Sequence, residues 1–243
     1  MKKTKAKEQV KDTKEKSYIY KFKLLPANIL SMIILVILGF ITIILMNKVG
    51  GSRSYEINFF FFLYVMIYLG VHELLHGLGY VLGGGKIKNI YYGVALEKGL
   101  LCCLCRQEIS KKNILISLQM PFMVIGVITY IVGFIIMDHV LILLSICNLV
   151  GASMDLVMFL YIARIKKVRY SETDANDEFV LISNEDLTKR KSMFFEIKEV
   201  KDYKKEDFIF GKKKRVDVTK ASWIILVVLV AFVILTLLPL LFL

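Results

Sequence analysis

The sequence predicts an all-α integral membrane protein with about five transmembrane helices, a small cytoplasmic β-hairpin loop, and a small cytoplasmic segment that is α+β or partly ordered. Two observations carry this prediction. Apolar residues make up 56% of the 243-residue chain and the mean hydropathy is +0.61, which is too apolar for a water-soluble domain. In addition, five runs reach the roughly 20 residues that cross a hydrocarbon core: 27–46, 57–82, 114–137, 140–163 and 222–243.

The basic residues lie almost entirely on one side of these spans. If residues 1–26 are cytoplasmic, then all of the 33 Lys and Arg except Lys48 and Arg53 fall in that segment or in the inner segments 83–113 and 164–221. This positive-inside pattern predicts a multi-pass protein of the cell membrane with a cytoplasmic N-terminus. The net charge of +12 therefore reflects topology and contact with the lipid bilayer, and without a recognition motif we expect no nucleic-acid partner.

The chain divides into four parts. Residues 1–23 contain nine Lys and little that is apolar before Tyr18, which predicts a flexible, basic cytoplasmic tail. Residues 24–163 form a four-span core, residues 164–221 a charged cytoplasmic segment, and residues 222–243 a C-terminal transmembrane helix. The first span is expected to be retained, because it is too long for the apolar region of a signal peptide and lacks a small-residue cleavage site.

The cytoplasmic loop 83–113 opens on three glycines, which end the second span. In its middle, β-branched, aromatic and apolar residues stand on both sides of "EKG" (97–99), which predicts a β-hairpin. The hairpin ends on "CCLC" (102–105). A disulfide framework is not expected in the cytoplasm, and a thiolate metal site would need a second Cys pair, so we interpret these thiols as structural or incidental.

Four ionisable residues fall inside the predicted spans: His72, Glu73, His76 and Asp155. Such groups cost several kcal/mol each in a bilayer. Histidines four residues apart project from one helix face, the spacing at which two imidazoles bind one zinc ion, and Glu73 is placed to act on a water at that ion. At 1.5 Å per residue, the histidines and Asp155 lie roughly 9–15 Å below the inner surface, so Asp155 is the candidate third ligand. The alternative is a chance match, with hydrogen-bonded bundle histidines.

These residues carry a resemblance. "HELLH" in a span, the hairpin loop, "MPF" opening the next span and "NLVGASMD" in the fourth resemble the bacterial zincin peptidases that are membrane-embedded relatives of site-2 proteases. The resemblance covers roughly residues 57–163. It implies a bound Zn²⁺ and the following roles: His72, His76 and Asp155 as metal ligands, Glu73 as catalytic base, and Asn148 as a polar group facing the site.

The fourth span departs from the pattern of site-2 proteases. Those proteins carry a proline-rich stretch from Asn to Asp-Gly, whereas here Leu156 follows Asp155 and no proline precedes it. The departure concerns how the fourth helix opens for a substrate. Asn148 lies two helical turns before Asp155, on the same face of one continuous helix, and it has a second interpretation as a residue that makes a hydrogen bond between helices.

We therefore expect a zinc metallopeptidase that cleaves membrane-embedded or membrane-proximal bonds near the cytoplasmic face, in a membrane-anchored protein or peptide. The hairpin 90–105 could hold an unwound substrate by strand addition. The alternatives are a non-catalytic zinc-binding membrane scaffold or regulator, and a metal transporter, which would need more polar residues in the outer half of the spans. A protease of the CAAX-processing type is disfavoured, because it takes a third ligand from a later Glu and no intramembrane Glu follows His76.

Overall fold

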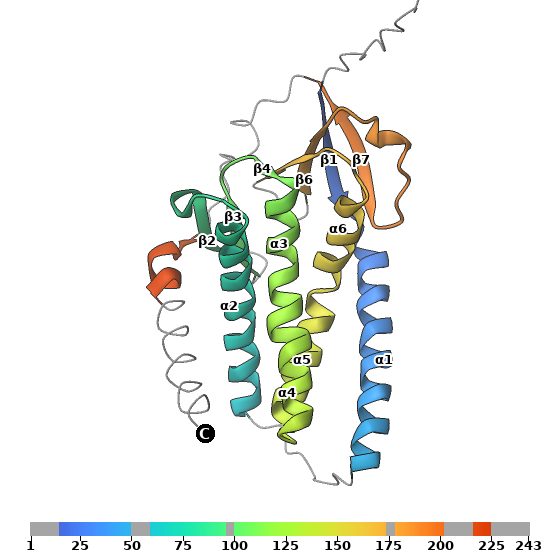
Figure 1. The fold of residues 1–243 in the computed structure, drawn as a ribbon, viewed down its shortest axis with the longest axis vertical. Coiled ribbons are helices and arrows are strands. Elements are labelled where there is room, and N and C mark those ends of the chain that lie inside the picture. Colours follow the sequence, from blue (N-terminus) through green and yellow to red (C-terminus); the bar gives the residue numbers. More distant parts are fainter. Residues whose placement is uncertain (1–14, 50–58, 96–99, 174–177, 202–215, 225–243) are drawn as a thin grey trace, which may run out of the picture.

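The computed structural model describes residues 15–49, 59–95, 100–173, 178–201 and 216–224. Its long helices stand side by side, and its strands gather around one end of them, which we call the sheet end (Figure 1). The helices are α1 (Leu24–Val49), α2 (Phe59–Leu82), α3 (Lys111–Pro121), the π-helix η3 (Phe122–Ile128), α4 (Thr129–Ile135), α5 (His139–Gly151) and α6 (Ser153–Ala163), with short 3₁₀ turns η1 (Ile87–Asn89) and η4 (Leu187–Lys189).

Three helical stretches are long and apolar enough to cross a membrane: Leu24–Asn47, Tyr64–Leu82 and Lys111–Ile136. Helices α5 and α6 pass the same test only as a pair, and they are bent by 48° at the break between them. The described residues therefore contain three candidate spans, or four if the bent pair is one span, where we expected five. The expected fifth span lies outside the described residues except for 222–224.

The surface of α1 is compatible with a location in a membrane. Its large apolar side chains point outward along most of its length, and Val36 and Phe40, for example, are each 65% exposed. Soluble proteins rarely expose an apolar surface that extends along most of a long helix. On its inner side α1 contacts α5 and α6, where the hydroxyls of Ser31 and Ser153 lie 2.8 Å apart.

A five-stranded antiparallel sheet covers the sheet end of α6. Its order is β4-β5-β6-β1-β7. The strands are β1 (Lys16–Phe22), β4 (Ile109–Ser110), β5 (Arg169–Glu172), β6 (Glu178–Ser183) and β7 (Phe195–Val200). The sheet thus combines a strand that precedes the first candidate span with three strands that follow α6. The expected flexible tail is wrong for residues 16–22, which form β1.

Alternating side chains explain why β1 is a strand in the middle of the sheet. Tyr18 and Tyr20 are fully buried, whereas Ile19 between them is only partly buried and Lys21 is exposed. The Tyr20 ring stacks on Phe179 of β6, with 5.1 Å between ring centroids. Its hydroxyl lies 3.1 Å from the hydroxyl of Tyr161 on α6, so β1 also attaches the sheet to that helix.

The hairpin is confirmed. Strands β2 (Ile90–Ala95) and β3 (Leu100–Cys105) pair antiparallel, and the residues 96–99 between them lie outside the described part. A third strand, β8 (Val216–Asp217), pairs with β2 on its other edge, in the order β3-β2-β8. Strand β3 is therefore an edge strand of this sheet, and it packs against α2.

The expectation of an all-α fold is wrong. Two antiparallel sheets accompany the helices, and the larger one has five strands, so the protein has mixed helical and sheet structure. The physical reason lies in segments that carry many charges between short apolar runs. Those runs, such as the one in β6, supply the buried face of a sheet that packs on helix ends rather than crossing a bilayer.

Candidate metal centre

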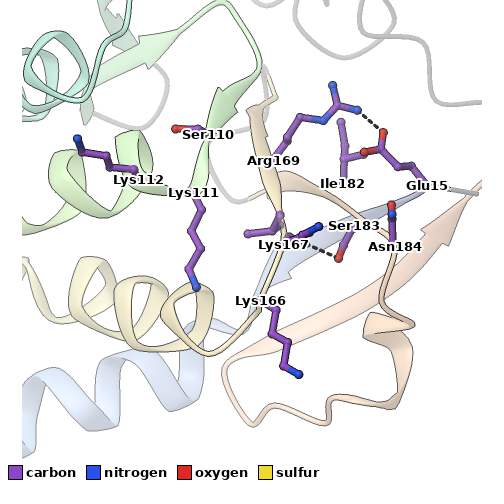
Figure 2. A pocket seen from close by; sticks show the side chains of 11 residues that line it. Glu15, Ser110, Lys111, Lys112, Lys166, Lys167, Arg169, Ile182, Ser183 and Asn184 are labelled. Carbon is purple, nitrogen blue, oxygen red and sulfur yellow. Dashed lines mark hydrogen bonds and ion pairs between the residues drawn. The ribbon is translucent and has the colours of Figure 1, made fainter. Parts of the chain in front are cut away.

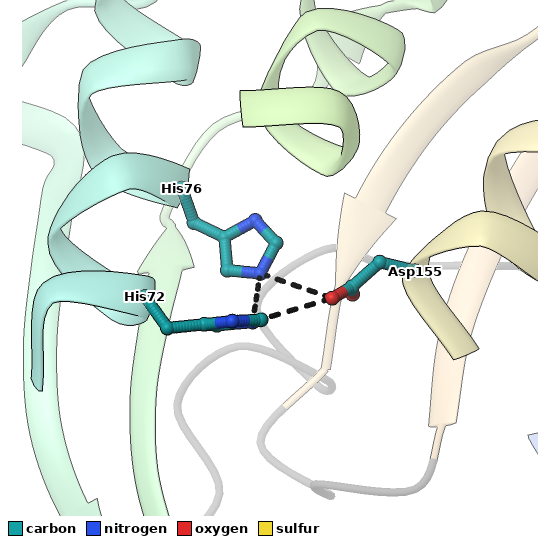
Figure 3. A group of neighbouring side chains, drawn as sticks. All are labelled: His72, His76 and Asp155. Atoms are coloured by element: carbon teal, nitrogen blue, oxygen red, sulfur yellow. Dashed lines mark hydrogen bonds and ion pairs between the residues drawn. The ribbon is translucent and has the colours of Figure 1, made fainter. Parts of the chain in front are cut away.

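The structure brings His72, His76 and Asp155 together (Figure 3). Both histidines come from α2, and Asp155 comes from the first turn of α6. The Nε2 atoms of His72 and His76 lie 3.1 Å apart, and Oδ2 of Asp155 lies 3.3 Å and 3.5 Å from them. The three side chains are largely buried, with exposed fractions of 13%, 12% and 19%.

A hydrogen-bond chain fixes the proton on the His72 ring. The carbonyl of Pro121 can only accept, so the Asn148 side chain presents its Nδ2 to it, at 3.1 Å. Asn148 Oδ1 therefore faces His72 Nδ1, at 2.8 Å, and the ring must donate from Nδ1. In the neutral ring this leaves the Nε2 lone pair directed at His76 and Asp155.

The His76 ring is held in the same way by α3. The carbonyl of Ser117 accepts from its Nδ1 at 3.0 Å, and the Ser117 hydroxyl donates to the His76 carbonyl at 2.9 Å. In an α-helix the Ser117 carbonyl would bind the N–H four residues on, but that residue is Pro121, which has none. The proline in "MPF" thus leaves an acceptor available for His76.

A glycine lets α3 come this close. A Cβ atom on Gly79 would lie 2.5 Å from Ser117 Cα and 3.0 Å from Ser117 N, which are backbone atoms that cannot turn away. Gly79 lies three residues beyond His76 on α2, so the contact between helix backbones and the contact between His76 and Ser117 belong to the same turn. Of the other glycines beside the motif, Gly77 faces the Tyr92 ring and Gly70 has nothing within 4 Å of such a Cβ.

Asn148 and Asp155 do not lie on one continuous helix, in contrast to our expectation. The chain bends at Ala152, between α5 and α6, directly after Gly151 and without a proline. The bend makes Asp155 part of the first turn of a new helix, where the helix dipole favours a negative charge. Asn148 stays at the end of α5, beside His72.

The donor set fits a divalent metal ion. With both Nδ1 atoms donating, the two Nε2 atoms and Oδ2 of Asp155 are three electron-pair donors that face one another, which is unfavourable without a cation between them. Bonds of 2.0–2.2 Å to a tetrahedral zinc ion would place its ligand atoms about 3.3 Å apart. The three separations of 3.1, 3.3 and 3.5 Å match this edge length. Histidine ligands of metals also donate their second N–H to a carbonyl or amide oxygen, as both do here.

Glu73 lines the same cavity as the three donors. The cavity has a volume of about 480 Å³ and lies between the sheet end of α2, the edge strand β3, α6 and the five-stranded sheet. Cys103 on β3 lines the cavity together with Glu73. The cavity therefore joins the donors, the neighbouring acid and the edge of the hairpin in one space.

Sequence reasoning missed the buried acid of this cavity at the end of β5, Glu172. It is only 8% exposed and accepts a hydrogen bond from the hydroxyl of Tyr80 on α2. Burial raises the pKa of Glu172 to about 7, although the Tyr80 hydroxyl opposes this shift. No signal in the sequence singles it out, because it stands in a charged segment where acids are common.

A second pocket, lined by Lys111, Lys112, Lys166, Lys167 and Arg169, lies between the start of α3 and the sheet (Figure 2). The ammonium groups of Lys111, Lys112 and Lys166 point in different directions there. Lys111 donates to the carbonyls of Ala163 and Ile165, so it caps the end of α6. Arg169 pairs with Glu15 and Glu108. Lys111 and Arg169 therefore help to hold α3, α6 and the sheet together.

Comparison with known proteins agrees with this geometry. Residues 65–170, fewer than half of the chain, match the model of a family described as "Putative zincin peptidase". The match supports a zincin-like family. It contains His72, Glu73, His76, Asn148 and Asp155, and it suggests zinc as the metal and peptide hydrolysis as the reaction. No curated protein and no solved structure matches the chain.

Proposed function

We propose that the chain is a zinc-dependent intramembrane endopeptidase of the cell membrane. Its ligands are His72, His76 and Asp155, and its substrates are membrane-anchored proteins or peptides. The observation that supports this most is the triangle of donor atoms, whose two imidazoles are both turned toward Asp155 by acceptors on their far sides. A bound zinc ion supplies a Lewis acid that activates water and polarises a carbonyl.

The acid beside the first histidine performs the proton transfers. Glu73 takes a proton from the attacking water and delivers it to the amine that leaves, which gives two peptide products from one peptide and one water. Asn148 acts through His72: both ends of its amide are engaged by protein groups, which makes it a positioning residue rather than a group that touches the substrate.

The edge of β3 holds the substrate. A transmembrane helix must unwind before cleavage, because its carbonyls are bonded within the helix. Leu101, Cys102, Cys103 and Leu104 of β3 line the cavity that contains the donors. An unwound segment that adds to this edge as a strand places its backbone next to Glu73 and the metal ligands. With the N-terminus in the cytoplasm, the cleaved bond lies near the cytoplasmic face.

The test combines metal content with cleavage by the purified full-length protein in detergent. Glu73→Gln is expected to retain zinc and to lower kcat for a labelled, span-containing peptide by a factor of about 10² or more, since it removes the proton carrier. Asp155→Ala is expected to lose both zinc and activity. Removal of zinc by a chelator abolishes cleavage by the unmodified protein, and added zinc restores it.

Asp138→Asn is the matched control, because this residue caps the opposite end of α5 and Asn also caps a helix. It is expected to keep zinc and cleavage. Full cleavage by Glu73→Gln, or full zinc retention by Asp155→Ala, contradicts the proposed roles. A protein that holds zinc, cleaves nothing and keeps its activity in cells after Glu73→Gln is a zinc-binding scaffold instead.

A further inference from the structure

Glu172 is a buried acid that is neither a proposed metal ligand nor part of the proposed proton transfers. Its Oε1 accepts from the Tyr80 hydroxyl, and its Oε2 is a buried oxygen with no hydrogen-bond partner among the described residues. Most buried polar atoms have a partner, and a carboxylate oxygen without one costs free energy. Glu172 is more than nine-tenths buried and still leaves Oε2 without a hydrogen-bond donor. We therefore infer that the donor for this oxygen does not belong to the described residues.

The position of Glu172 relates it to the metal centre. Tyr80 lies one helical turn beyond His76 on α2, about 6 Å further along the axis toward the sheet. Glu172 reaches Tyr80 from β5, and its side chain lines the same cavity as His76 and Asp155. The carboxyl group therefore stands on the sheet side of the donors, where a substrate that occupies the cavity continues past the cleaved bond.

The charge of this cavity favours a cation. Its lining includes Glu73, Asp155, Glu172 and Glu178, while no Lys or Arg from the part of the chain that the structure describes lines it. A divalent metal ion would neutralise only part of this charge. Of the four acids, Glu178 at the wall already has a cation within reach, Lys21, whose Nζ is 3.7 Å away.

We propose that Glu172 forms a subsite for a Lys or Arg side chain of the substrate, on the sheet side of the cleaved bond. This inference rests on the proposed peptidase function. Transmembrane segments carry an excess of Lys and Arg directly after their apolar run on the cytoplasmic side, and the sheet end is the end where this chain carries its own basic segments. A substrate span bound in the cavity brings such a cation to the depth of Glu172.

The experiment uses the full-length protein and peptides that consist of one apolar span followed by a single Lys. The Lys is moved one residue at a time along the cytoplasmic end, and each peptide has a partner with Gln at that position. Cleavage is measured as kcat/KM. Binding is measured separately in the Glu73→Gln background, by fluorescence anisotropy of labelled peptide, so that it does not depend on turnover.

At one position, both kcat/KM and binding affinity are expected to be about tenfold or more higher for the Lys peptide than for the Gln peptide. This is the effect of a charge-assisted hydrogen bond. In Glu172→Gln the Lys and Gln peptides are expected to be cleaved and bound equally well. In Glu172→Lys, a peptide with Glu at the same position is expected to be preferred over the Lys peptide. Glu196→Gln, an exposed acid on β7, is the control and leaves the ratio unchanged. Zinc content is measured for every variant.

An unchanged ratio in Glu172→Gln, or an equal loss for both peptides, overturns the subsite, because a merely structural role affects both peptides alike. Absence of cleavage by the zinc-loaded unmodified protein overturns the peptidase function instead. In that case the anisotropy ratio still decides whether Glu172 selects a cation.

Discussion

At the scale of single residues, the candidate metal centre depends on the hydrogen-bond acceptor behind each histidine ring. His72 and His76 could turn their rings in several ways, but Asn148 Oδ1 and the Ser117 carbonyl each accept from Nδ1. These two acceptors select the ring nitrogen that faces Asp155. The pattern HELLH alone predicts two histidines on one helix face, whereas the orientation of their rings depends on residues on other helices.

Asn148→Ala is expected to weaken zinc binding by about 10–100-fold, because His72 loses the acceptor that orients it. Competition with a chelator of known affinity measures the change. Ser145→Ala is the matched control, since Ser145 also lies on α5 and makes a hydrogen bond to another helix, with Thr129. Equal zinc affinities for Asn148→Ala and Ser145→Ala would show that Asn148 does not position His72.

Glu172 predicts how the stability of the metal-free protein depends on pH. Its pKa of about 7 in the folded state lies above the usual 4.5 of an unfolded chain, so folding disfavours the ionised form. This cost is absent below about pH 4.5, grows up to pH 7 and is constant above it. Glu172→Gln is therefore expected to raise the free energy of unfolding by on the order of 2–3 kcal/mol at pH 8.

Thermal unfolding in detergent, with zinc removed, measures this effect at pH 8 and pH 5. The advantage of Glu172→Gln over the unmodified protein should shrink markedly at the lower pH, whereas Glu196→Gln should differ little from the unmodified protein at both. A constant difference across this range would mean that Glu172 does not ionise with a raised pKa.

At the scale of elements, the contact between α2 and α3 sets the geometry of the site. Gly79 allows the backbone of α3 to approach, and Pro121 leaves the Ser117 carbonyl without its helical partner. The break at Ala152 then directs α6 so that Asp155 meets the histidines. A small residue, a proline and a bend in three different helices thus produce one arrangement of donor atoms.

Gly79→Ala is expected to force α2 and α3 apart, because the new methyl group would overlap the backbone of Ser117. Such overpacking costs about 1–3 kcal/mol, and zinc affinity should fall as His76 loses its acceptor. Thermal unfolding and chelator competition measure the two effects. Gly70→Ala on the same helix meets nothing within 4 Å and should change neither by much. Similar results for both variants would contradict the role of Gly79.

At the scale of the whole molecule, the five-stranded sheet joins segments from both ends of the helical core. β1 precedes α1, β5 to β7 follow α6, and the sheet supplies Phe22, Tyr170 and Glu172 to the wall of the cavity. The family match ends at residue 170, so most of this wall lies outside it. The sheet is therefore part of the site and not an appendage to it.

Tyr20→Ala tests this connection, because Tyr20 stacks on Phe179 and reaches Tyr161 on α6. The loss of a fully buried aromatic side chain is expected to cost about 3–5 kcal/mol in the free energy of unfolding. Lys21→Ala, on the exposed face of the same strand, should cost about 0.5 kcal/mol or less. A small effect of Tyr20→Ala on thermal unfolding would show that β1 is not integral to the folded protein.

The sequence was sufficient for features that depend on local pattern. The hydropathy of the spans, and the depth of Asp155 calculated from it, predicted that Asp155 lies near the two histidines. Composition predicted the hairpin β2–β3. It was not sufficient where distant segments meet. The partners of β1 lie far along the chain, although the aromatic and β-branched run from Tyr18 to Tyr20 is a strand signal. Gly151 and Ser153 flank the bend at Ala152, but no proline marks it, and the role of Glu172 becomes visible only from its contact with Tyr80.

The place of β1 in the sheet also sets an order of events during synthesis. Tyr20 pairs with Phe179, which the ribosome makes roughly 160 residues later, after helices α1 to α6. At about 5–20 residues per second this delay is about 8–30 seconds. Throughout that time β1 lacks both of its neighbours, β6 and β7. The cavity around the donor atoms thus gains its last wall only after the helices that carry His72, His76 and Asp155 have been synthesised.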